Sequence, residues 1–234
     1  MNAKDGAWTD LGRMPYSACT ELQKRVLTQV AQGTLPNTLL FVEHEPAVFS
    51  LGAGFKEEHL LRTREEYKRL GFDVEPTERG GDVTFHGEDQ LVAYPIFHLD
   101  LVQRDLHRWL RDLEEAIILA LKTWNIAGYR FPPHTGVWVN GAKICAIGVK
   151  VRKWVSMHGI ALNVSNDLSP FELIVPCGIE GYGVTSIQKE LGRPIPLEEA
   201  RRATRRAFEE VFGISLKEVS QETLHNRLSE RAAP

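Results

Sequence analysis

The Asn140-Gly141 pair constrains the fold of this chain more than any other dipeptide. It separates two β-rich segments in "TGVWVNGAKICAIGVKV", and Asn-Gly is favoured in two-residue hairpin turns because both positions need a positive φ. Strands joined by so short a turn run antiparallel, whereas parallel strands need a long crossover. The pair therefore predicts an antiparallel hairpin within a β-rich region.

Helical periodicity marks the segments between the predicted strands. The segment 105–124, "DLHRWLRDLEEAIILALKTW", places its large apolar side chains on one stripe, as an amphipathic helix does. Similar patterns predict helices over 15–33, 63–71 and 194–213, each of which closes on a glycine. Because the strands come in runs with helices between the runs, we expect an α+β fold rather than an alternating βαβ pattern.

The composition is that of an ordinary globular protein with a sizeable core. Of the 234 residues, 43% are hydrophobic and 25% are charged. No linker, low-complexity tract or repeat divides the chain, so we expect one domain over 1–234 with its core from about 10 to about 215. The polar sequence after about 215 is expected to form a loosely attached tail.

No feature of the sequence indicates secretion, membrane insertion or nucleic-acid binding. The N-terminal "MNAKDGAWTDLG" lacks the basic and apolar segments of a secretory signal, and no apolar run is long enough to cross a bilayer. The formal charge of -3 provides no general attraction to nucleic acid. We therefore expect a cytoplasmic protein with no membrane and no nucleic-acid partner.

Cysteines, histidines and glycines do not form the patterns of metal or nucleotide sites. Cys19, Cys145 and Cys177 are an odd number at wide spacings, which fits neither a disulfide framework nor a zinc knuckle. The eight histidines lack metal-ligand spacing, and no phosphate-binding glycine motif occurs. We expect reduced thiols, no metal and no bound cofactor.

Two features are unusual for an apolar core. The Arg79-Gly80-Gly81 triplet before a predicted strand indicates either a tight turn, the commoner case, or close approach of a ligand to the backbone. His86, at the end of that strand, is by itself more typical of a satisfied structural histidine. Lys143 in "GAKICAIG" either reaches solvent near the predicted turn or is held inside, and alternation predicts that Cys145 shares its face.

Cys177 lies at a backbone corner within "ELIVPCGIEGYGVTSI". Most free cysteines are buried small hydrophobes. Here Pro176 and Gly178 favour a turn that presents the thiol to a pocket, where backbone N–H groups could hold an oxyanion. Thr185 with Gln188 predicts a capped short helix soon after. A neighbouring ammonium would favour the reactive thiolate.

Five ordered motifs together resemble the lipoate-protein ligase B family, the octanoyltransferases of lipoyl-cofactor assembly. They are "RGGDVTFHG", "QLVAYPI", "GAKICAIGVKV", "MHGIALNV" and "LSPFELIVPCG", while "EHEPAVFSLG" resembles an early segment of that family. The match runs from about residue 37 to about residue 191. The resemblance implies the fold of the biotinyl/lipoyl protein ligase catalytic domain, a mixed, mostly antiparallel sheet flanked by helices.

The resemblance also implies a reaction. An octanoyl group would pass from octanoyl-acyl carrier protein, through a thioester on Cys177, to a lysine of lipoyl domains. The acceptors would be 2-oxoacid dehydrogenase E2 subunits and the glycine cleavage H protein, and thioester exchange would need no ATP. Cys177 matches the family's nucleophile and Lys143 matches the lysine that tunes it.

Further family positions imply the acyl-substrate site. His86 and His158 are candidates for pocket lining and proton handling. The matching residues are Arg79, Gly80, Gly81, Asp82, Val83, Thr84, Phe85, His86, Ala146, Ile147, Gly148, Gly159, Ile160 and Ala161.

The chain departs from the family pattern in two places. Glu88-Asp89 stands where the family usually has Pro-Gly, which changes the charge of the loop after His86. Ala146-Ile147-Gly148 replaces the commoner Ser-Leu-Gly and removes a hydroxyl. Neither change falls on Cys177 or Lys143.

Other functions remain open at this point. One is an ATP-dependent lipoate or biotin ligase of the same fold, which would not need a catalytic cysteine. Another is a non-catalytic regulator that binds carrier or lipoyl domains. A thiol protease or thioesterase has less support, because hydrolysis must admit water to the intermediate. Cys145 is the alternative nucleophile, although we expect it to be a packed strand residue.

Overall fold

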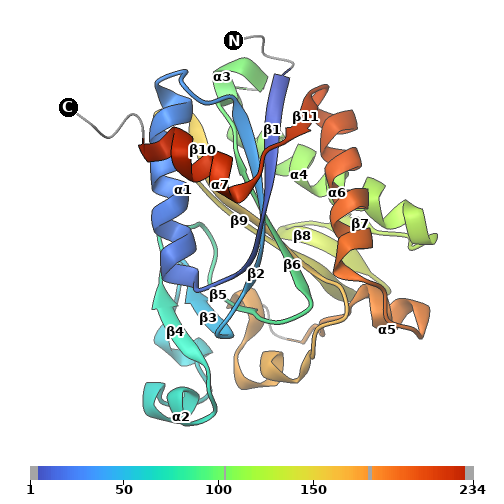
Figure 1. Cartoon of the computed structure of the whole chain (residues 1–234). Helices are drawn as coiled ribbons and strands as arrows, with labels where there is room; N and C mark the ends of the chain where they lie inside the picture. Colours follow the sequence, from blue (N-terminus) through green and yellow to red (C-terminus); the bar gives the residue numbers. More distant parts are fainter. Residues whose placement is uncertain (1–4, 103, 179–180, 230–234) are drawn as a thin grey trace.

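A computed structural model of the chain describes residues 5–102, 104–178 and 181–229 and shows two β-sheets with helices around them (Figure 1). The main sheet has eight strands, in which β1 pairs in parallel with β2 and β11 and every other neighbour is antiparallel. This confirms the predicted mixed, mostly antiparallel sheet. In spatial order the strands are β11 (Ser215–Glu218), β1 (Asp5–Met14), β2 (Asn37–His44), β6 (Gln90–Ile96), β10 (Val155–Asn163), β9 (Ala142–Arg152), β8 (His134–Val139) and β7 (Tyr129–Phe131).

Helices cover both faces of the main sheet, and its central strands are therefore buried on both sides. In β2, Leu39 and Phe41 join the core with α4 (Leu106–Leu121) and α6 (Leu197–Phe212). The alternate residues Leu40 and Val42 join the core with α1 (Tyr16–Ala31) and α7 (Gln221–Ser229). This alternation follows from the two-residue period of a strand. Each such side chain contributes about 1.5–3 kcal/mol when fully buried.

A smaller sheet packs against the segment that precedes Cys177. Its strands are β4 (Asp73–Pro76), β3 (Val48–Leu51) and β5 (Val83–His86), in that order. Phe49 and Phe85 from this sheet form a separate core with Tyr67 of α2 (Arg64–Arg69). Phe171 and Ile174 pack into the same core. The segment immediately before Cys177 is therefore anchored by its packing in this core. The 3-10 turns are η1 (Glu57–His59), η2 (Lys122–Trp124), η3 (Ser169–Leu173) and η4 (Pro176–Gly178). The short helices are α3 (Leu99–Val102) and α5 (Ile187–Leu191).

The predicted turn and helix ends are mostly confirmed. Asn140 and Gly141 have φ angles of 49° and 82° between β8 and β9, as the hairpin prediction requires. Thr63 caps α2 in a capping box with Glu66, and α6 ends at Gly213, which is left-handed.

The predicted cap of the short helix α5 is wrong by one residue. Ser186, rather than Thr185, accepts a hydrogen bond from the Lys189 N–H. The Thr185 hydroxyl instead donates to Glu190. The side chain of Thr185 is therefore used within the helix region but does not cap it.

The C-terminal segment also differs from its prediction. Residues 215–229 form β11 and α7 rather than a loose tail, and β1 already begins at Asp5. Leu216 joins the core beneath α6, while Leu224 and Leu228 join the core beneath α1. These few leucines are enough to anchor a segment whose other side chains are mostly polar. Within the described ranges, no helix has the length and apolar character needed to cross a membrane.

Candidate active site

A cavity of about 240 Å³ brings together residues from widely separated parts of the sequence. Cys177 lies in its wall, and so does Lys143 from β9. The sequence-predicted residues that line it are Arg79, Gly81, Asp82, Thr84, His86, Lys143, Ala146, Ile147, Gly148, His158, Gly159, Ile160, Ala161 and Cys177.

Three of the predicted substrate residues do not line this cavity. On β5, Thr84 faces the cavity, whereas Val83 and Phe85 face the core of the small sheet. Successive strand residues point to opposite faces, so a continuous motif cannot place every side chain in one pocket. The Gly80 N–H donates to the Val149 carbonyl at 2.8 Å and joins this loop to β9. These three residues therefore shape the site from behind.

Lys143 is held inside rather than reaching solvent. It is buried, and its Nζ lies 5.1 Å from the centroid of the Trp138 ring. Gly136 on the neighbouring strand has a φ of +131°, and a Cβ there would lie 3.4 Å from Cε of Lys143 and 2.7 Å from the carbonyl oxygen of Cys145. The absence of a side chain at Gly136 therefore allows the close approach of the Cys145 carbonyl, while the lysine chain packs beside the glycine at contact distance.

Cys145 does not share the face of Lys143, contrary to the alternation prediction. Val137 pairs with Cys145 but Trp138 pairs with Lys143, so Ile144 is an extra residue in a β-bulge. The bulge turns the fully buried Cys145 into the core beneath α4. Burial raises the pKa of its thiol, which keeps it protonated. The prediction of a packed strand residue is confirmed.

Cys177 lies in a strained turn. Its φ and ψ are 58° and 17°, a left-handed conformation that a side chain rarely adopts. The Gly178 N–H donates to the Val175 carbonyl at 3.1 Å. That N–H is therefore occupied and is not a free donor for an oxyanion in this conformation.

The segment that follows Cys177 pairs with the backbone of Lys143. The Lys143 N–H donates to the Gly183 carbonyl, and the Thr185 N–H donates to the Lys143 carbonyl, both at 3.0 Å. These bonds make a parallel bridge between Lys143 and Val184. Residues 183–185 therefore fix the backbone of Lys143.

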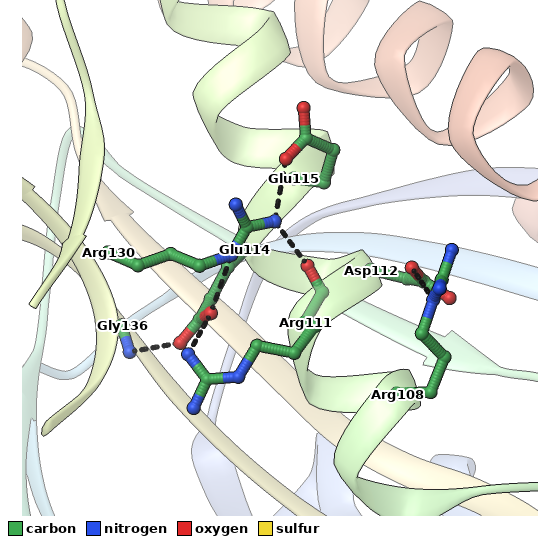
Figure 2. A network of polar contacts seen from close by, with 7 residues as sticks. All are labelled: Arg108, Arg111, Asp112, Glu114, Glu115, Arg130 and Gly136. Carbon is green, nitrogen blue, oxygen red and sulfur yellow. Dashed lines mark hydrogen bonds and ion pairs between the residues drawn. The ribbon is translucent and has the colours of Figure 1, made fainter. Parts of the chain in front are cut away.

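A buried carboxylate on α4 binds β8 at Gly136 (Figure 2). The Glu114 side chain is fully buried, and its Oε1 accepts from the Gly136 N–H at 3.1 Å. Its Oε2 is 2.7 Å from Nη1 of Arg111 and 3.1 Å from Nε of Arg130. Through Gly136, this ion-pair network supports the wall next to the lysine.

A directed chain of hydrogen bonds organises the opposite wall. Arg79 donates through Nε and Nη2 to the Ser50 hydroxyl oxygen, at 3.2 and 2.9 Å. Ser50 Oγ is 3.0 Å from Nε2 of His86, and Nδ1 of His86 is 3.0 Å from Oε1 of Gln90. Since the Gln90 amide nitrogen donates elsewhere, Nδ1 of His86 is the donor and Nε2 the acceptor.

Burial keeps His86 and His158 of the cavity uncharged. It lowers the pKa of His86 well below the ordinary value, and the nearby His44 and Arg79 lower it further. It also lowers the pKa of His158 to about 4. Both imidazoles are therefore neutral at neutral pH and could act as hydrogen-bond partners rather than as charges.

Several residues at the cavity were not predicted from the sequence. Tyr16 stacks on His86 at 5.7 Å between ring centroids, although nothing in its helical segment marked it. The additional cavity residues are Tyr16, Tyr94, Pro133, His134 and Thr135. His59 was also not predicted. Its Nδ1 lies 2.6 Å from Oδ2 of Asp82, which lines the cavity. These contacts join distant segments and leave no local sequence signal. Among the residues that the structure describes, no three His, Cys, Asp or Glu side chains are grouped as metal ligands.

The unusual Glu88-Asp89 pair keeps a tight turn after His86. Asp89 has a φ of 59°, and its N–H donates to Oε2 of Glu43 at 2.6 Å. Arg13 forms ion pairs with both Glu43 and Glu88. Neither Glu88 nor Asp89 lines the cavity. The departure from the family pattern therefore changes the charge next to the site without altering the cavity wall.

The fold defines a catalytic domain of the lipoyl and biotin protein ligase type. Among solved structures, that of an archaeal bipartite lipoate protein ligase and its E2 lipoyl domain from Thermoplasma acidophilum superposes with a TM-score of 0.71. The alignment has 17% identity and covers 97% of this chain and 91% of that one. At this identity the likeness establishes the fold alone.

Sequence comparison then places the chain within that class. Residues 15–209 match the model of the lipoyl protein ligase A/B catalytic domain. An octanoyltransferase of Rubrobacter xylanophilus is 50% identical over 86% of this chain and 91% of its own length. One of Geobacter metallireducens is 46% identical over 85% and 90%. The chain belongs to the octanoyltransferases of the lipoyl protein ligase A/B family. It is an acyltransferase, as the motifs predicted.

Proposed function

We propose that the enzyme moves an octanoyl group from octanoyl-acyl carrier protein to a lysine of a lipoyl domain through a thioester on Cys177. The observation that carries this proposal is that Cys177 and Lys143 line the same cavity. Thiols at other described positions are less suited, because Cys19 and Cys145 are buried and burial raises the pKa of both, that of Cys19 to about 12.

In the first half-reaction, the Cys177 thiolate attacks the thioester carbonyl of the donor. A bond from Sγ to the acyl carbon forms, and the bond to the carrier thiol breaks. The carrier sulfur leaves and takes up the proton that Cys177 gave up. Lys143 as an ammonium would favour the thiolate by charge. One thioester replaces another, so this step needs no ATP.

In the second half-reaction, the acceptor lysine amine attacks the same acyl carbon. A C–N bond forms, the bond to Sγ breaks, and the amine loses a proton. Lys143 in its neutral form would accept that proton. The two half-reactions use one sulfur in turn, so the kinetics should be ping-pong.

The cavity wall suits an acyl chain next to a polar end. Ala146, Ile147, Ile160 and Ala161 supply apolar surface from β9 and β10. Each methylene buried there contributes about 0.8 kcal/mol. Chain-length selectivity would follow from how many methylenes the cavity holds.

The acceptors that we propose are lipoyl domains of 2-oxoacid dehydrogenase E2 subunits and the glycine cleavage H protein. Support comes from the related fold of the Thermoplasma acidophilum ligase, whose structure includes an E2 lipoyl domain. The acyl carrier protein donor stays a prediction from the family resemblance, and a cytoplasmic location stays a prediction from the sequence analysis.

Intact mass after mixing with octanoyl-carrier protein tests the covalent step. We expect one added octanoyl group on the unaltered protein, lost in Cys177→Ala and kept in Cys145→Ala. No adduct on the unaltered protein would sink the covalent mechanism. An adduct that disappears with Cys145→Ala instead would reassign the nucleophile.

Two further measurements define the role of Lys143 and the donor. We expect Lys143→Ala to leave the fold intact by circular dichroism and to slow both half-reactions. Normal transfer by that variant would refute the role of the lysine. Incubation with free lipoate and ATP, compared with octanoyl-carrier protein alone, distinguishes the transferase from an ATP-dependent ligase of the same fold.

A further inference from the structure

A histidine that the acyl-transfer mechanism does not use lies behind the nucleophile turn. His59 is the last residue of η1, and its Nδ1 is 2.6 Å from Oδ2 of Asp82. The two side chains are only 12% and 10% exposed. Asp82 lines the cavity with Cys177 and Lys143. The pair therefore connects the cavity wall to the segment behind it.

Backbone pairing joins His59 to the chain that leads into Cys177. The His59 carbonyl accepts from the Val175 N–H at 2.9 Å. Leu60 and Ile174 form an antiparallel bridge, and the Leu61 N–H donates to the carbonyl of residue 173 at 3.2 Å. Residues 59–61 therefore run alongside residues 173–175. A displacement of His59 would be transmitted to the turn.

The contact at Gly178 shows how closely the pair packs on that turn. Gly178 has a φ of +65°, and a Cβ added there would lie 2.9 Å from both Oδ2 of Asp82 and Cε1 of His59. No side chain fits between the turn and the pair. A carboxylate is therefore a direct neighbour of the residue that follows the nucleophile.

A carboxylate at this place works against the chemistry unless it is restrained. A nearby negative charge disfavours a thiolate and attracts an ammonium. Both oxygens of Asp82 are occupied, because Oδ1 accepts from the Val83 N–H at 2.6 Å and Oδ2 faces His59. Without His59, Oδ2 would be free to accept from a donor in the cavity, such as the Cys177 thiol or the Lys143 ammonium.

We propose that His59 is a positioning residue for acyl transfer, which binds the Asp82 carboxylate and keeps its charge from acting on Cys177 and Lys143. The Nδ1–H of His59 donates to Oδ2, and no covalent bond of the pair changes during the reaction. The inference rests on the proposed role of Cys177 as the nucleophile.

Alkylation of Cys177 by iodoacetamide tests the inference without an acyl donor. The rate is followed by mass of the Cys177 peptide from neutral to alkaline pH in the full-length protein. We expect His59→Ala to slow alkylation at neutral pH about tenfold, which moves the half-maximal pH upward by about one unit. His59→Asn, which keeps a donor near the position of Nδ1, should retain most of the rate.

A double variant separates charge restraint from simple support of the turn. We expect Asp82→Asn alone to react at least as fast as the unaltered protein, because the charge is gone. The double variant His59→Ala with Asp82→Asn should then recover the rate of Asp82→Asn. If the pair only supported the turn, each single variant would be slow and the double variant slower still.

Apart from His59 and Asp82, the titratable groups that line the cavity with Cys177 are the same in every variant of the series. They are Lys143, Arg79, His86, His134 and His158, together with Tyr16 and Tyr94. A change in the pH profile therefore reports the His59 and Asp82 pair.

Two results would overturn the inference: an unchanged alkylation profile in His59→Ala, or a double variant no faster than His59→Ala. Octanoyl loading of the unaltered protein is measured in parallel by intact mass. If that protein is never loaded, the proposed function fails, while the alkylation series still decides whether His59 restrains Asp82.

Discussion

Glu114 offers the most direct test of how the fold supports the site. We consider Glu114→Gln, which keeps the shape of the side chain and an oxygen for the Gly136 N–H but removes the charge. The lost interactions are the charged hydrogen bonds to Arg111 and Arg130 (Figure 2). The matched control is Asp112→Asn on the same helix, whose carboxylate pairs with Arg108 at 2.8 Å.

The expected cost follows from burial. Removing one partner of a buried ion pair costs about 3–5 kcal/mol. The Glu114 side chain is 0% exposed, but those of Arg111 and Arg130 are 42% and 32% exposed, so water can solvate them once the carboxylate is gone. We therefore expect a smaller loss, at or just below the lower limit of this range, of about 2–3 kcal/mol in the free energy of unfolding. The control pair includes an arginine that is 64% exposed and should contribute less than about 0.5 kcal/mol.

Urea denaturation at neutral pH, at low and high salt, measures both variants. The loss in Glu114→Gln should persist at high salt, because its carboxylate is shielded from ions, whereas any effect of Asp112→Asn should fade. Octanoyl loading should also slow in Glu114→Gln, since Gly136 borders Lys143. A loss of stability no larger than that of the control would refute the reasoning that this buried network holds β8.

Three other predictions concern the C-terminal segment, the buried histidines and the cavity. Leu224→Ala should lose about 2–5 kcal/mol of stability in urea, because the side chain is buried beneath α1; a loss below about 0.5 kcal/mol would instead support a loose tail. Burial lowers the pKa of His44 from 6.5 to about 4, so the unfolded chain binds a proton in that window that the folded chain does not. The free energy of unfolding should therefore fall as the pH drops from about 6.5 to about 4, and less steeply in His44→Gln; equal slopes would contradict the assignment. Ala146→Leu fills part of the cavity and should shift the preference from octanoyl towards hexanoyl donors by about tenfold, given about 0.8 kcal/mol per methylene. An unchanged preference in competition assays would show that the acyl chain binds outside this part of the cavity.

Local signals in the sequence determined much of the fold. The Asn140-Gly141 turn, the Thr63 cap and the stripe of α4 are read from a few neighbouring residues, and the structure contains each of them. The family motifs likewise placed Cys177 and Lys143 in one site before their contacts were known, and the two residues line one cavity. Such features are predictable because turn geometry, capping and periodicity depend on short stretches of chain.

Tertiary structure decided what depends on distant partners. The bulge at Ile144 places Cys145 and Lys143 on different faces of the sheet, and the bulge exists only in the pairing of β8 with β9. The contact between His59 and Asp82 joins two segments that meet only when the small sheet packs beside the turn at Cys177. The sequence by itself led to the proposal that Cys177 and Lys143 carry the chemistry, because those residues lie in recognisable motifs. Long-range packing decided the surroundings of both residues, because the carboxylates and histidines near them come from elements far away in the chain.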